Sequence, residues 1–588
     1  MLKSAPLLAT CLLGITLSGC ASLTGSEDTA GNKDAAASPD AQPASTTSAD
    51  EPKAITYADF EPDVLYLLLA GEIAAQRGRF DVTLVNYLNA AKKSRDKGVI
   101  ERAMRIAQSL NGDNAQKQLA DLWLEVDPDN LQALRVSAIQ AVKRNELNAA
   151  LGYMEQIMNQ GGDADFDSLA AMAQNLPEEQ QQELLLLYKE LADRYPNSPE
   201  LEYSIALLLK VTGDPGQALN RLATLLEENP NFQPAIILKG DLLYQQNAQQ
   251  QALDYLMTNT RRFPENRRMG ALYGRMLIGE GELQAAQDEF KRLVQQYPNT
   301  PGLRLSHALV ALENDQPALA KQELTRLIEQ GHHTNEANYY LGRLEDAEGN
   351  YERAIGYYQG VKKGNYYFPA LARTSALLAE DGKLDDAIRS IRNLKGANPQ
   401  QAENFWLLEI NLLLDQDKDE AALETASEAL QEFPDNIQIR YARAMMLDTL
   451  DKPGRAEEDL RYIIDEDPGN AVALNALGYI LTTRTDRLEE ARNYIERALA
   501  LDPENPAILD SMGWVLFREG QLEPALDYLA RAWSAFPDPE VAAHYGEALW
   551  VSGAEDQARI VWKEGLEQDA DHSVLRETIE RLTDGGEL

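Results

Sequence analysis

The sequence predicts an all-α fold in which about fifteen antiparallel helix pairs stack into a superhelical solenoid. Three observations lead to this prediction. Small residues recur at steps of 34 at Ala206, Gly240, Gly274, Ala308 and Gly342. A second series of alanines and a series of prolines repeat at nearly the same step. Because one helix pair cannot bury its apolar face alone, stacked neighbours must supply the core.

Each recurring position has a structural reason. Glycine or alanine lets two antiparallel helices approach closely, Gly281 or Gly520 can form a left-handed turn between them, and proline ends the second helix. The alanine series comprises Ala218, Ala252, Ala286, Ala320, Ala354, Ala387, Ala422, Ala456, Ala491, Ala525 and Ala558. The proline series comprises Pro196, Pro230, Pro264, Pro298, Pro399, Pro434, Pro468, Pro503 and Pro537.

The stretch "PAILDSMGWVLFREGQLEPALDYLARAWSAFPD" is the clearest single unit. Met512 and Gly513 stand in its first helix, Ala525 and Leu529 in its second, and Pro537 closes it. This pattern resembles the tetratricopeptide repeat, which has Leu-Gly or Leu-Ala in the first helix, Ala and a large residue in the second, and Pro after it. The resemblance implies a superhelix whose concave groove binds proteins.

Residues 1–19 are predicted to be a signal peptide that is removed. Lys3 precedes an apolar run, Ala5–Leu17, that is too short to remain in a bilayer as a spanning helix. The following "LSGC" resembles the bacterial lipobox, in which the cysteine, here Cys20, is lipidated and becomes the first residue. An ordinary secretory signal with a chance cysteine is the alternative. If the lipobox is real, Cys11 is lost with the signal peptide.

Residues 20–56 are predicted to be the lipidated cysteine and a disordered linker. The linker is rich in Ala, Ser, Thr, Asp, Gly and Pro, so it cannot bury enough apolar surface to fold. Its average reach is roughly 30 to 36 Å. Ala21 follows the cysteine where retained inner-membrane lipoproteins typically have aspartate. By resemblance to that sorting pattern, we expect a lipid anchor in the outer membrane, with the chain facing the periplasm.

Three segments follow the linker. Residues 57–198 are expected to be divergent helical repeats, with an uncertain register over 94–116 and without small residues in the unit near Asp165. Residues 199–572 are expected to be regular repeats, although His332 occupies a proline position, and residues 573–588 a capping helix and tail. Units are predicted to begin near residues 64, 97, 131, 165, 199, 233, 267, 301, 335, 368, 402, 437, 471, 506 and 539, with a last helix from about Ser573.

The charge argues against a nucleic-acid-binding protein, and the cysteine content argues against a fold held by disulfides. The chain has 55 basic and 94 acidic residues, a net charge of −39, which would repel nucleic acid over most of its surface. Its two cysteines, Cys11 and Cys20, provide no disulfide framework.

Sequence motifs for catalysis or metal binding are not found. There is no His-Glu-x-x-His, no phosphate-binding glycine loop and no Gly-x-Ser-x-Gly elbow, and the pair His332-His333 is expected in a solvated turn. Asp415, Asp417 and Asp419 alternate like a calcium loop. However, the sixth position is not glycine and the twelfth is not a carboxylate, so this run is expected to be a turn between helices. We predict no cofactor, no metal and no enzymatic activity.

The candidate binding residues lie one turn apart on the expected inner face of the first helices. They are aromatic residues and arginines, which binding hot spots favour: Tyr203, Tyr244, Arg275, Tyr339, Arg343, Trp406, Tyr441, Tyr479, Trp514, Phe517 and Trp550. The alternative is that individual members pack against neighbouring helices. A basic cluster around one repeat junction, Arg261, Arg262, Arg267 and Arg268, is either a solvated turn or a partner contact.

Lipobox, linker and repeats together resemble the outer-membrane tetratricopeptide lipoproteins of the LbcA type, which act as adaptors of periplasmic carboxyl-terminal processing proteases. This resemblance implies that protein partners, a protease and its peptidoglycan hydrolase substrates, are brought together, and that the membrane is contacted through the lipid anchor only. An assembly factor for an envelope machine such as a pilus, secretion or polysaccharide-export system is the alternative. An enzyme with an unrecognised site is a third class.

Overall fold

The computed structural model describes residues 61–144, 146–162 and 166–583. In these ranges the chain forms 31 α-helices and no β-strand, which confirms the predicted all-α class. The predicted signal peptide, the lipidation site Cys20 and the predicted linker lie outside the described residues. None of the helices in the described ranges is long and apolar enough to cross a membrane.

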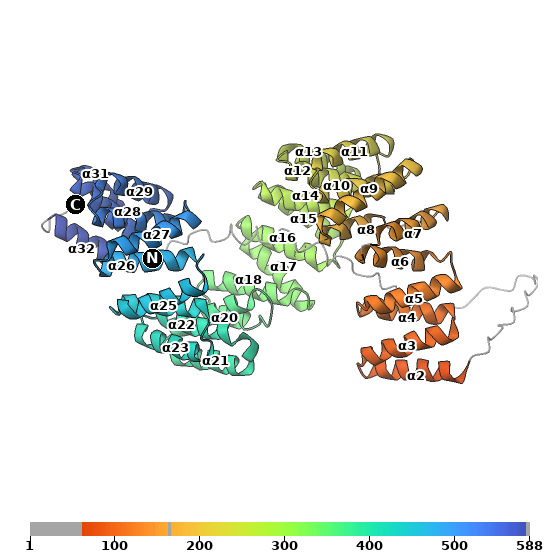
Figure 1. Cartoon of the computed structure of the whole chain (residues 1–588), viewed down its shortest axis with the longest axis horizontal. Coiled ribbons are helices and arrows are strands. Elements are labelled where there is room, and N and C mark those ends of the chain that lie inside the picture. Colours follow the sequence, from red (N-terminus) through yellow and green to blue (C-terminus); the bar gives the residue numbers. More distant parts are fainter. Residues whose placement is uncertain (1–60, 145, 163–165, 584–588) are drawn as a thin grey trace, which may run out of the picture. The chain divides into compact units, whose positions relative to one another are not determined.

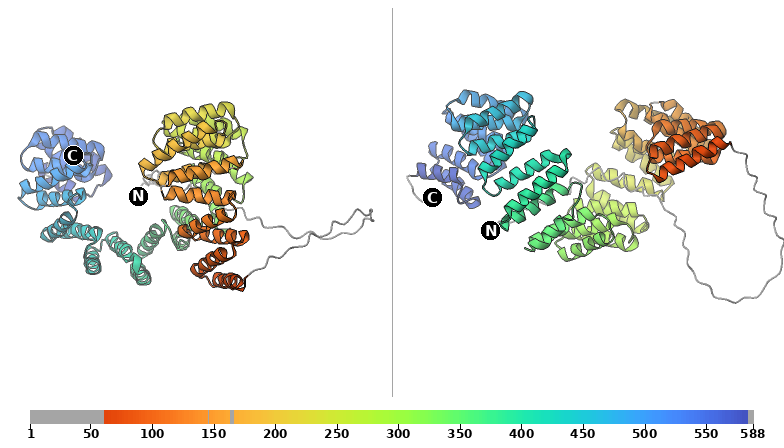
Figure 2. Two further views of the ribbon diagram at one scale, coloured as in Figure 1. Left: turned by 45° about the vertical axis from the view of Figure 1, so that its right-hand side comes forward. Right: turned by 90° about the horizontal axis from the view of Figure 1, so that it is seen from below.

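The chain divides into two compact units, Met1–Glu323 and Leu324–Leu588. The boundary falls within the helix α17 (Pro317–Glu329). Inside each unit the helices follow one another side by side in sequence order (Figures 1 and 2). Most helices pack on their neighbours in the sequence, and some pack on helices two places away, as α8 does on α10.

Seven helix pairs precede α17 in unit 1. They are α2 (Pro62–Gln76) with α3 (Phe80–Ser94), α4 (Lys97–Ser109) with α5 (Asp113–Val126), α6 (Leu131–Lys143) with α7 (Leu147–Asn159), α8 (Phe166–Met172) with α9 (Glu178–Arg194), α10 (Pro199–Val211) with α11 (Pro215–Glu228), α12 (Gln233–Gln245) with α13 (Gln249–Arg262), and α14 (Arg267–Gly279) with α15 (Leu283–Gln296). The helix α16 (Pro301–Glu313) forms the next pair along the chain with α17.

Seven further pairs and a last helix make up unit 2. They are α18 (Thr334–Ala347) with α19 (Tyr351–Tyr358), α20 (Tyr367–Glu380) with α21 (Leu384–Ala397), α22 (Ala402–Leu414) with α23 (Asp419–Glu432), α24 (Ile437–Thr449) with α25 (Pro453–Glu466), α26 (Ala471–Arg484) with α27 (Leu488–Leu501), α28 (Pro506–Arg518) with α29 (Leu522–Ala535), α30 (Pro539–Val551) with α31 (Glu555–Gln568), and the last helix α32 (Ser573–Leu582).

These helices confirm the predicted fifteen pairs. Every first helix begins within two residues of its predicted start, and the last helix begins at Ser573 as predicted. The unit near Asp165 is a helix pair, but its first helix has only seven residues and ends in a 3-10 turn, Ala173–Asn175. The segment over 94–116, whose register the sequence left open, forms the end of α3, all of α4 and the start of α5.

Where the first small position is a glycine, as in the five pairs named below, it receives a large side chain from the second helix. A methyl group added to the glycine there would lie 2.0 to 2.7 Å from that side chain, closer than atoms can pack. The pairs are Gly240 with Leu256, Gly274 with Phe290, Gly342 with Tyr358, Gly513 with Leu529 and Gly546 with Trp562. Because glycine has no side chain at this position, the large side chain of the second helix fits against the first helix and the two helices interlock.

The second small position and the helix ends also follow the predicted pattern. All eleven alanines from Ala218 to Ala558 are completely buried. Gly281 and Gly520 have φ of 76° and 78°, and Asp417 adopts the same left-handed conformation at 53°, so the acidic run around it is the predicted turn between helices. Each proline of the third series stands two residues after the end of a second helix.

The core of each unit is a series of apolar clusters between adjacent pairs. In unit 1 the largest fully buried side chains include Tyr188 and Phe290, and in unit 2 they include Phe405 and Trp562. Each cluster takes residues from consecutive pairs, as expected for a repeat protein in which neighbours complete one another's core.

Candidate functional site

The eleven predicted binding residues all lie on first helices of pairs, but their surroundings differ. In unit 1, Tyr203 is half-buried and packs edge to face on Phe232, with ring centroids 5.8 Å apart. Burial raises the pKa of its hydroxyl to about 12. The hydroxyl of Tyr244 donates to Glu280 at 2.8 Å, and Arg275 is exposed. Of these three, only Arg275 has most of its side chain available to a partner.

In the middle of unit 2, Trp406 and Tyr441 pack into the core. Trp406 is only 8% exposed, and its indole N–H donates to the carboxylate of Glu432 at 3.0 Å. Tyr441 is half-buried against the same apolar cluster, and burial raises the pKa of its hydroxyl. The structure thus assigns both side chains to packing between neighbouring helices.

The predicted residues on α26, α28 and α30 form an internal aromatic cluster. Trp514 is 9% exposed and stacks on Phe517 on α28 and on His544 on α30, with centroids 5.2 Å and 4.1 Å away. The imidazole Nδ1 of His544 lies 2.9 Å from Asp510. Tyr479 donates a short hydrogen bond to Glu540. These side chains hold the three first helices together.

Charge and burial compete at this cluster. Burial alone would lower the pKa of His544, but the carboxylates of Asp510, Glu540 and Glu547 together outweigh it, so the pKa is raised above its ordinary value. At the last pair, Trp550 stacks on Trp562 with centroids 5.5 Å apart, and Arg559 lies over its ring. Trp550 therefore also serves packing between α30 and α31.

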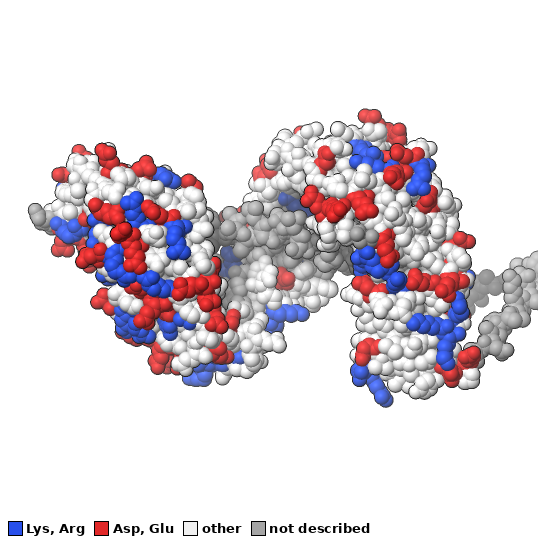
Figure 3. Space-filling model, in the orientation of Figure 1, with Lys and Arg blue, Asp and Glu red and all other residues white. Residues whose placement is uncertain are grey.

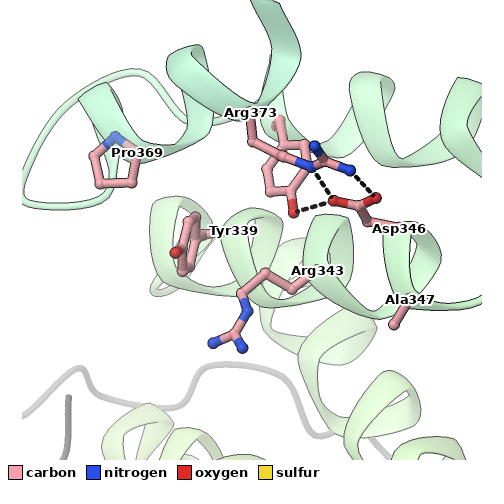
Figure 4. Close-up of a pocket in the computed structure, with 7 residues that line it drawn as sticks. Tyr339, Arg343, Asp346, Ala347, Pro369 and Arg373 are labelled. Atoms are coloured by element: carbon pink, nitrogen blue, oxygen red, sulfur yellow. Dashed lines mark hydrogen bonds and ion pairs between the residues drawn. The ribbon is translucent and has the colours of Figure 1, made fainter. Parts of the chain in front are cut away.

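Tyr339 and Arg343 are different, because they line a cavity of about 350 Å³ between α18, α19 and α20 (Figure 4). Its other lining residues are Asp346, Ala347, Tyr358, Pro369 and Arg373. Two predicted binding residues therefore share a cavity with further polar groups. A volume of this size accommodates a side chain or a small molecule.

Two tyrosines line the cavity, Tyr339 and Tyr358, and further tyrosines behind them hold the Tyr339 ring in place. The ring of Tyr339 stacks on Tyr366 with centroids 4.6 Å apart and meets Tyr340 edge to face at 5.5 Å. The hydroxyls of Tyr340 and Tyr366 are 3.2 Å apart. Tyr358 lies 6.1 Å from Tyr339, and its burial raises the pKa of its hydroxyl. The aromatic wall is therefore preorganised, with little rotamer freedom left in the Tyr339 ring.

The other wall carries two arginines, of which Arg373 is paired with carboxylates and Arg343 is not. Arg373 binds both oxygens of Asp346, through Nε at 2.6 Å and a terminal nitrogen at 2.9 Å, and also reaches Glu380 at 3.0 Å. The hydroxyl of Tyr358 points to the same Asp346 carboxylate at 3.4 Å. Arg343 forms no hydrogen bond or ion pair with any described residue, and Figure 4 shows its guanidinium directed away from Asp346.

The sequence analysis did not single out Tyr358, Tyr366 or Arg373. A signal for the tyrosines was present, since the chain has three Tyr-Tyr doublets within 29 residues, ending at Tyr340, Tyr358 and Tyr367. No sequence signal marks Arg373 as the partner of Asp346, because the two are 27 residues apart on different helices.

A second surface feature is a stripe of exposed apolar side chains on α2, which we call the α2 stripe. Leu65, Leu69 and Ile73 are 43%, 54% and 49% exposed and lie four residues apart, so they share one face of the helix, and Tyr66 beside them is 72% exposed. The surface over α2 and α3 is mostly uncharged at the lower right of Figure 3. Such a stripe on the first helix of a repeat array is typical of a surface that another molecule covers.

The remaining sequence candidates are the histidine pair after α17 and the basic cluster around a repeat junction. His332 and His333 are exposed in the turn after α17. In the basic cluster, Arg262 donates to Asn231 at 2.5 Å and Arg267 to Thr300 at 3.2 Å. Among the described residues, no group of three or more His, Cys, Asp or Glu is arranged to hold a metal ion.

Comparison with known proteins identifies the repeat. The model of the tetratricopeptide repeat matches residues 268–300, 305–366, 441–506 and 483–543. The chain is 38% identical over 588 residues to TPR repeat-containing protein PA4667 of Pseudomonas aeruginosa, covering 99% of this chain and 97% of that protein. The chain belongs to the tetratricopeptide-repeat protein family. A more distant relative is TPR repeat-containing protein YpiA of Bacillus subtilis, 23% identical over 77% of this chain and 99% of YpiA.

Two solved tetratricopeptide-repeat structures are similar to parts of the chain. The thermophilic TPR protein TTC0263 of Thermus thermophilus is 21% identical, covers 31% of this chain and 98% of its own, and has a TM-score of 0.28. The type IV pilus biogenesis factor PilW is 22% identical, covers 32% of this chain and 88% of its own, and also has a TM-score of 0.28. Tetratricopeptide repeats bind proteins, so the α2 stripe and the cavity are candidate contact surfaces of a scaffold.

Proposed function

We propose that this tetratricopeptide-repeat protein is a non-catalytic adaptor, anchored through a lipidated Cys20 to the periplasmic face of the outer membrane. Its partners in this proposal are a periplasmic carboxyl-terminal processing protease and the peptidoglycan hydrolases that the protease degrades. The lipobox-like "LSGC" supports the anchor. The resemblance of the whole chain to LbcA-type adaptors supports the choice of partners.

The observation that carries the adaptor function is the presence of two partner-type surfaces with different chemistry in separate units. The α2 stripe in unit 1 is apolar and exposed, which suits an apolar face on a partner. The cavity of Arg343 in unit 2 is aromatic and cationic, which suits a polar, negatively charged group. A chain that holds two different proteins needs two such dissimilar surfaces, whereas a simple dimerisation module needs only one.

In this function the chain accelerates proteolysis without entering the reaction. Holding protease and substrate on one scaffold raises their effective concentration and restricts their mutual orientation. A lipid anchor adds a further restriction, because several buried acyl chains retain the scaffold on the membrane where the cell-wall substrates are.

The anchor is tested by Cys20→Ser and cell fractionation. The variant should leave the outer membrane, because in this proposal the acyl chains hold the protein there. Recovery of the variant in the outer membrane to the same extent as the wild type would show that the lipoprotein assignment is wrong.

The adaptor function is tested by reconstitution of the chain with a carboxyl-terminal processing protease and a peptidoglycan hydrolase. Degradation of the hydrolase should be faster with the chain present and should stop entirely when the nucleophile of the protease is removed. Leu69→Ser combined with Ile73→Ser should reduce the acceleration, whereas Val472→Ser, which changes an equally exposed residue of unit 2, should not.

Two results of the reconstitution would refute the proposal. Hydrolysis of a substrate by the chain alone would make it an enzyme. A lack of any acceleration, together with co-purification of pilus, secretion or polysaccharide-export components, would favour an assembly factor.

A further inference from the structure

Arg343 is an arginine whose charge is not compensated by the protein around it. Asp346, three residues further along the same helix, has both oxygens engaged by Arg373 and is approached by the Tyr358 hydroxyl. Glu380 is bound by the same Arg373. The carboxylates at this cavity are therefore in use, and the guanidinium of Arg343 retains its five N–H donors for an external acceptor.

The net charge of −39 does not cancel this local positive charge. At physiological ionic strength charges are screened over about 8 Å, so the residues lining the cavity decide which ion enters it. The cavity is lined by two arginines, one aspartate, two tyrosines, an alanine and a proline. With Glu380 there are two carboxylates at the cavity, and Arg373 engages both, so neither is paired with Arg343. Arg343 would repel a cation that entered the cavity, whereas it would attract an anion and pair with it.

We propose that this cavity binds the carboxylate of a glutamate or aspartate side chain within a partner protein. Arg343 donates to the carboxylate, the fixed ring of Tyr339 packs on the methylene groups of the acid, and Ala347 and Pro369 complete an apolar rim. The volume of about 350 Å³ is sufficient for one such side chain and too small for a helix of the partner.

An internal acidic side chain fits better than the carboxyl terminus of a partner. A chain end brings backbone N–H and C=O groups into the cavity beside its carboxylate, and these need partners of their own. No asparagine or glutamine lines the cavity, and the Asp346 carboxylate already accepts from Arg373 and Tyr358. A glutamate or aspartate side chain brings only methylene groups and the carboxylate.

The inference relies on the proposed function only in taking the ligand from a protein. Its test therefore uses the purified full chain alone, without protease or substrate. A peptide library with random internal segments and blocked ends is selected on the wild type. Acid-containing peptides should be enriched on the wild type and lost on Arg343→Gln.

Affinity measurements on one enriched peptide and its Glu→Gln counterpart give the quantitative test. On the wild type, the acidic peptide should bind roughly 10-fold to 100-fold more tightly than its amide counterpart, as expected for a charge-assisted hydrogen bond. On Arg343→Gln the two peptides should bind equally, because the two changes remove the same interaction. Arg343→Lys should retain part of the preference, since it keeps the charge but not the planar fork.

A matched control removes a charge of the same kind in the same unit. Arg389 on α21 is exposed and outside the cavity, so Arg389→Gln should leave the preference for acid unchanged. Circular dichroism of all variants confirms that they fold, which is expected because Arg343 forms no bond within the described protein.

Three outcomes would overturn the inference: no enrichment of peptides on the wild type, enrichment that does not depend on an acid or on Arg343, and binding only of peptides with a free carboxyl terminus. The two proposals remain separable. Preference for acidic peptides without any acceleration of a protease would refute the adaptor alone, and acceleration without that preference would refute the assignment of the cavity alone.

Discussion

The interlock between Gly342 and Tyr358 gives a sharp test of the packing. In Gly342→Ala, the new methyl group would lie 2.6 Å from Cδ1 and 2.7 Å from Cε1 of Tyr358, well inside the 3.4 Å at which ordinary contact begins. Tyr358 is only 3% exposed and is held by Tyr339 and Val361 of the same cluster and by the contact of its hydroxyl with Asp346. Displacing the ring toward the neighbouring cavity would therefore break these contacts. Helix α18 must therefore shift relative to α19.

Two opposing effects set the magnitude for Gly342→Ala. Overpacking of this kind lowers the free energy of unfolding by about 1 to 3 kcal/mol, while replacing glycine by alanine inside a helix raises it by about 0.5 to 1 kcal/mol. We expect a net destabilisation of about 0.5 to 2 kcal/mol. The matched control is Gly356→Ala on α19 of the same pair. Nothing lies within 4 Å of the added methyl group there, so this variant should be stabilised by up to about 1 kcal/mol.

Local hydrogen exchange is the suitable assay for this interlock, because a repeat array opens in parts and exchange is read separately for each helix. Peptides from α18 and α19 should exchange roughly 2-fold to 30-fold faster in Gly342→Ala and no faster in Gly356→Ala. Equal protection of α18 in the wild type and in Gly342→Ala would refute the interlock.

Three further predictions concern other parts of unit 2. Asp459→Ala should destabilise its helix pair by about 3 to 5 kcal/mol, because two arginines lose a buried ion-pair partner. Asp386→Ala, which breaks an exposed ion pair, should change stability by less than about 1 kcal/mol. Urea unfolding measures both changes. Ala354→Leu should cost about 1 to 3 kcal/mol in the same assay, since this alanine is completely buried. Against burial, which lowers it, the pKa of His544 is raised above 6.5 by Asp510, Glu540 and Glu547, so its contribution to stability is fully present below pH 6.5 and is lost as the pH rises through the folded pKa. Because Asp510 is the largest raising influence, Asp510→Asn should remove this dependence in urea unfolding at pH 6 and pH 9.

The sequence was sufficient to predict the repeat and most helix starts. A glycine or alanine every 34 residues marks the position where two helices touch, and that requirement does not depend on distant parts of the chain. The first helix of the pair at Asp165 was harder to predict. The unit has no small residue at either contact position, and the structure gives its first helix only seven helical residues before Ala173.

The sequence was less informative about which inner-face residues are available to a partner. Trp514 and Arg343 occupy the same position in their repeats, but Trp514 stacks on His544 from the next pair, while the guanidinium of Arg343 finds no partner among the described residues. The difference at Arg343 depends on Asp346 being bound by Arg373, a contact between two pairs that spacing does not reveal. The predictions for Cys20 and the signal peptide concern residues outside the described structure.

The local character of the packing has a consequence for how the chain folds. Within each unit, the extensive contacts join helices that are adjacent or next but one in the sequence. Folding therefore does not depend on closing long loops, which is the slow step for chains with distant pairings. Each pair can dock on the previous one as soon as its roughly 34 residues are available, so a growing chain exposes only the apolar face of its newest repeat.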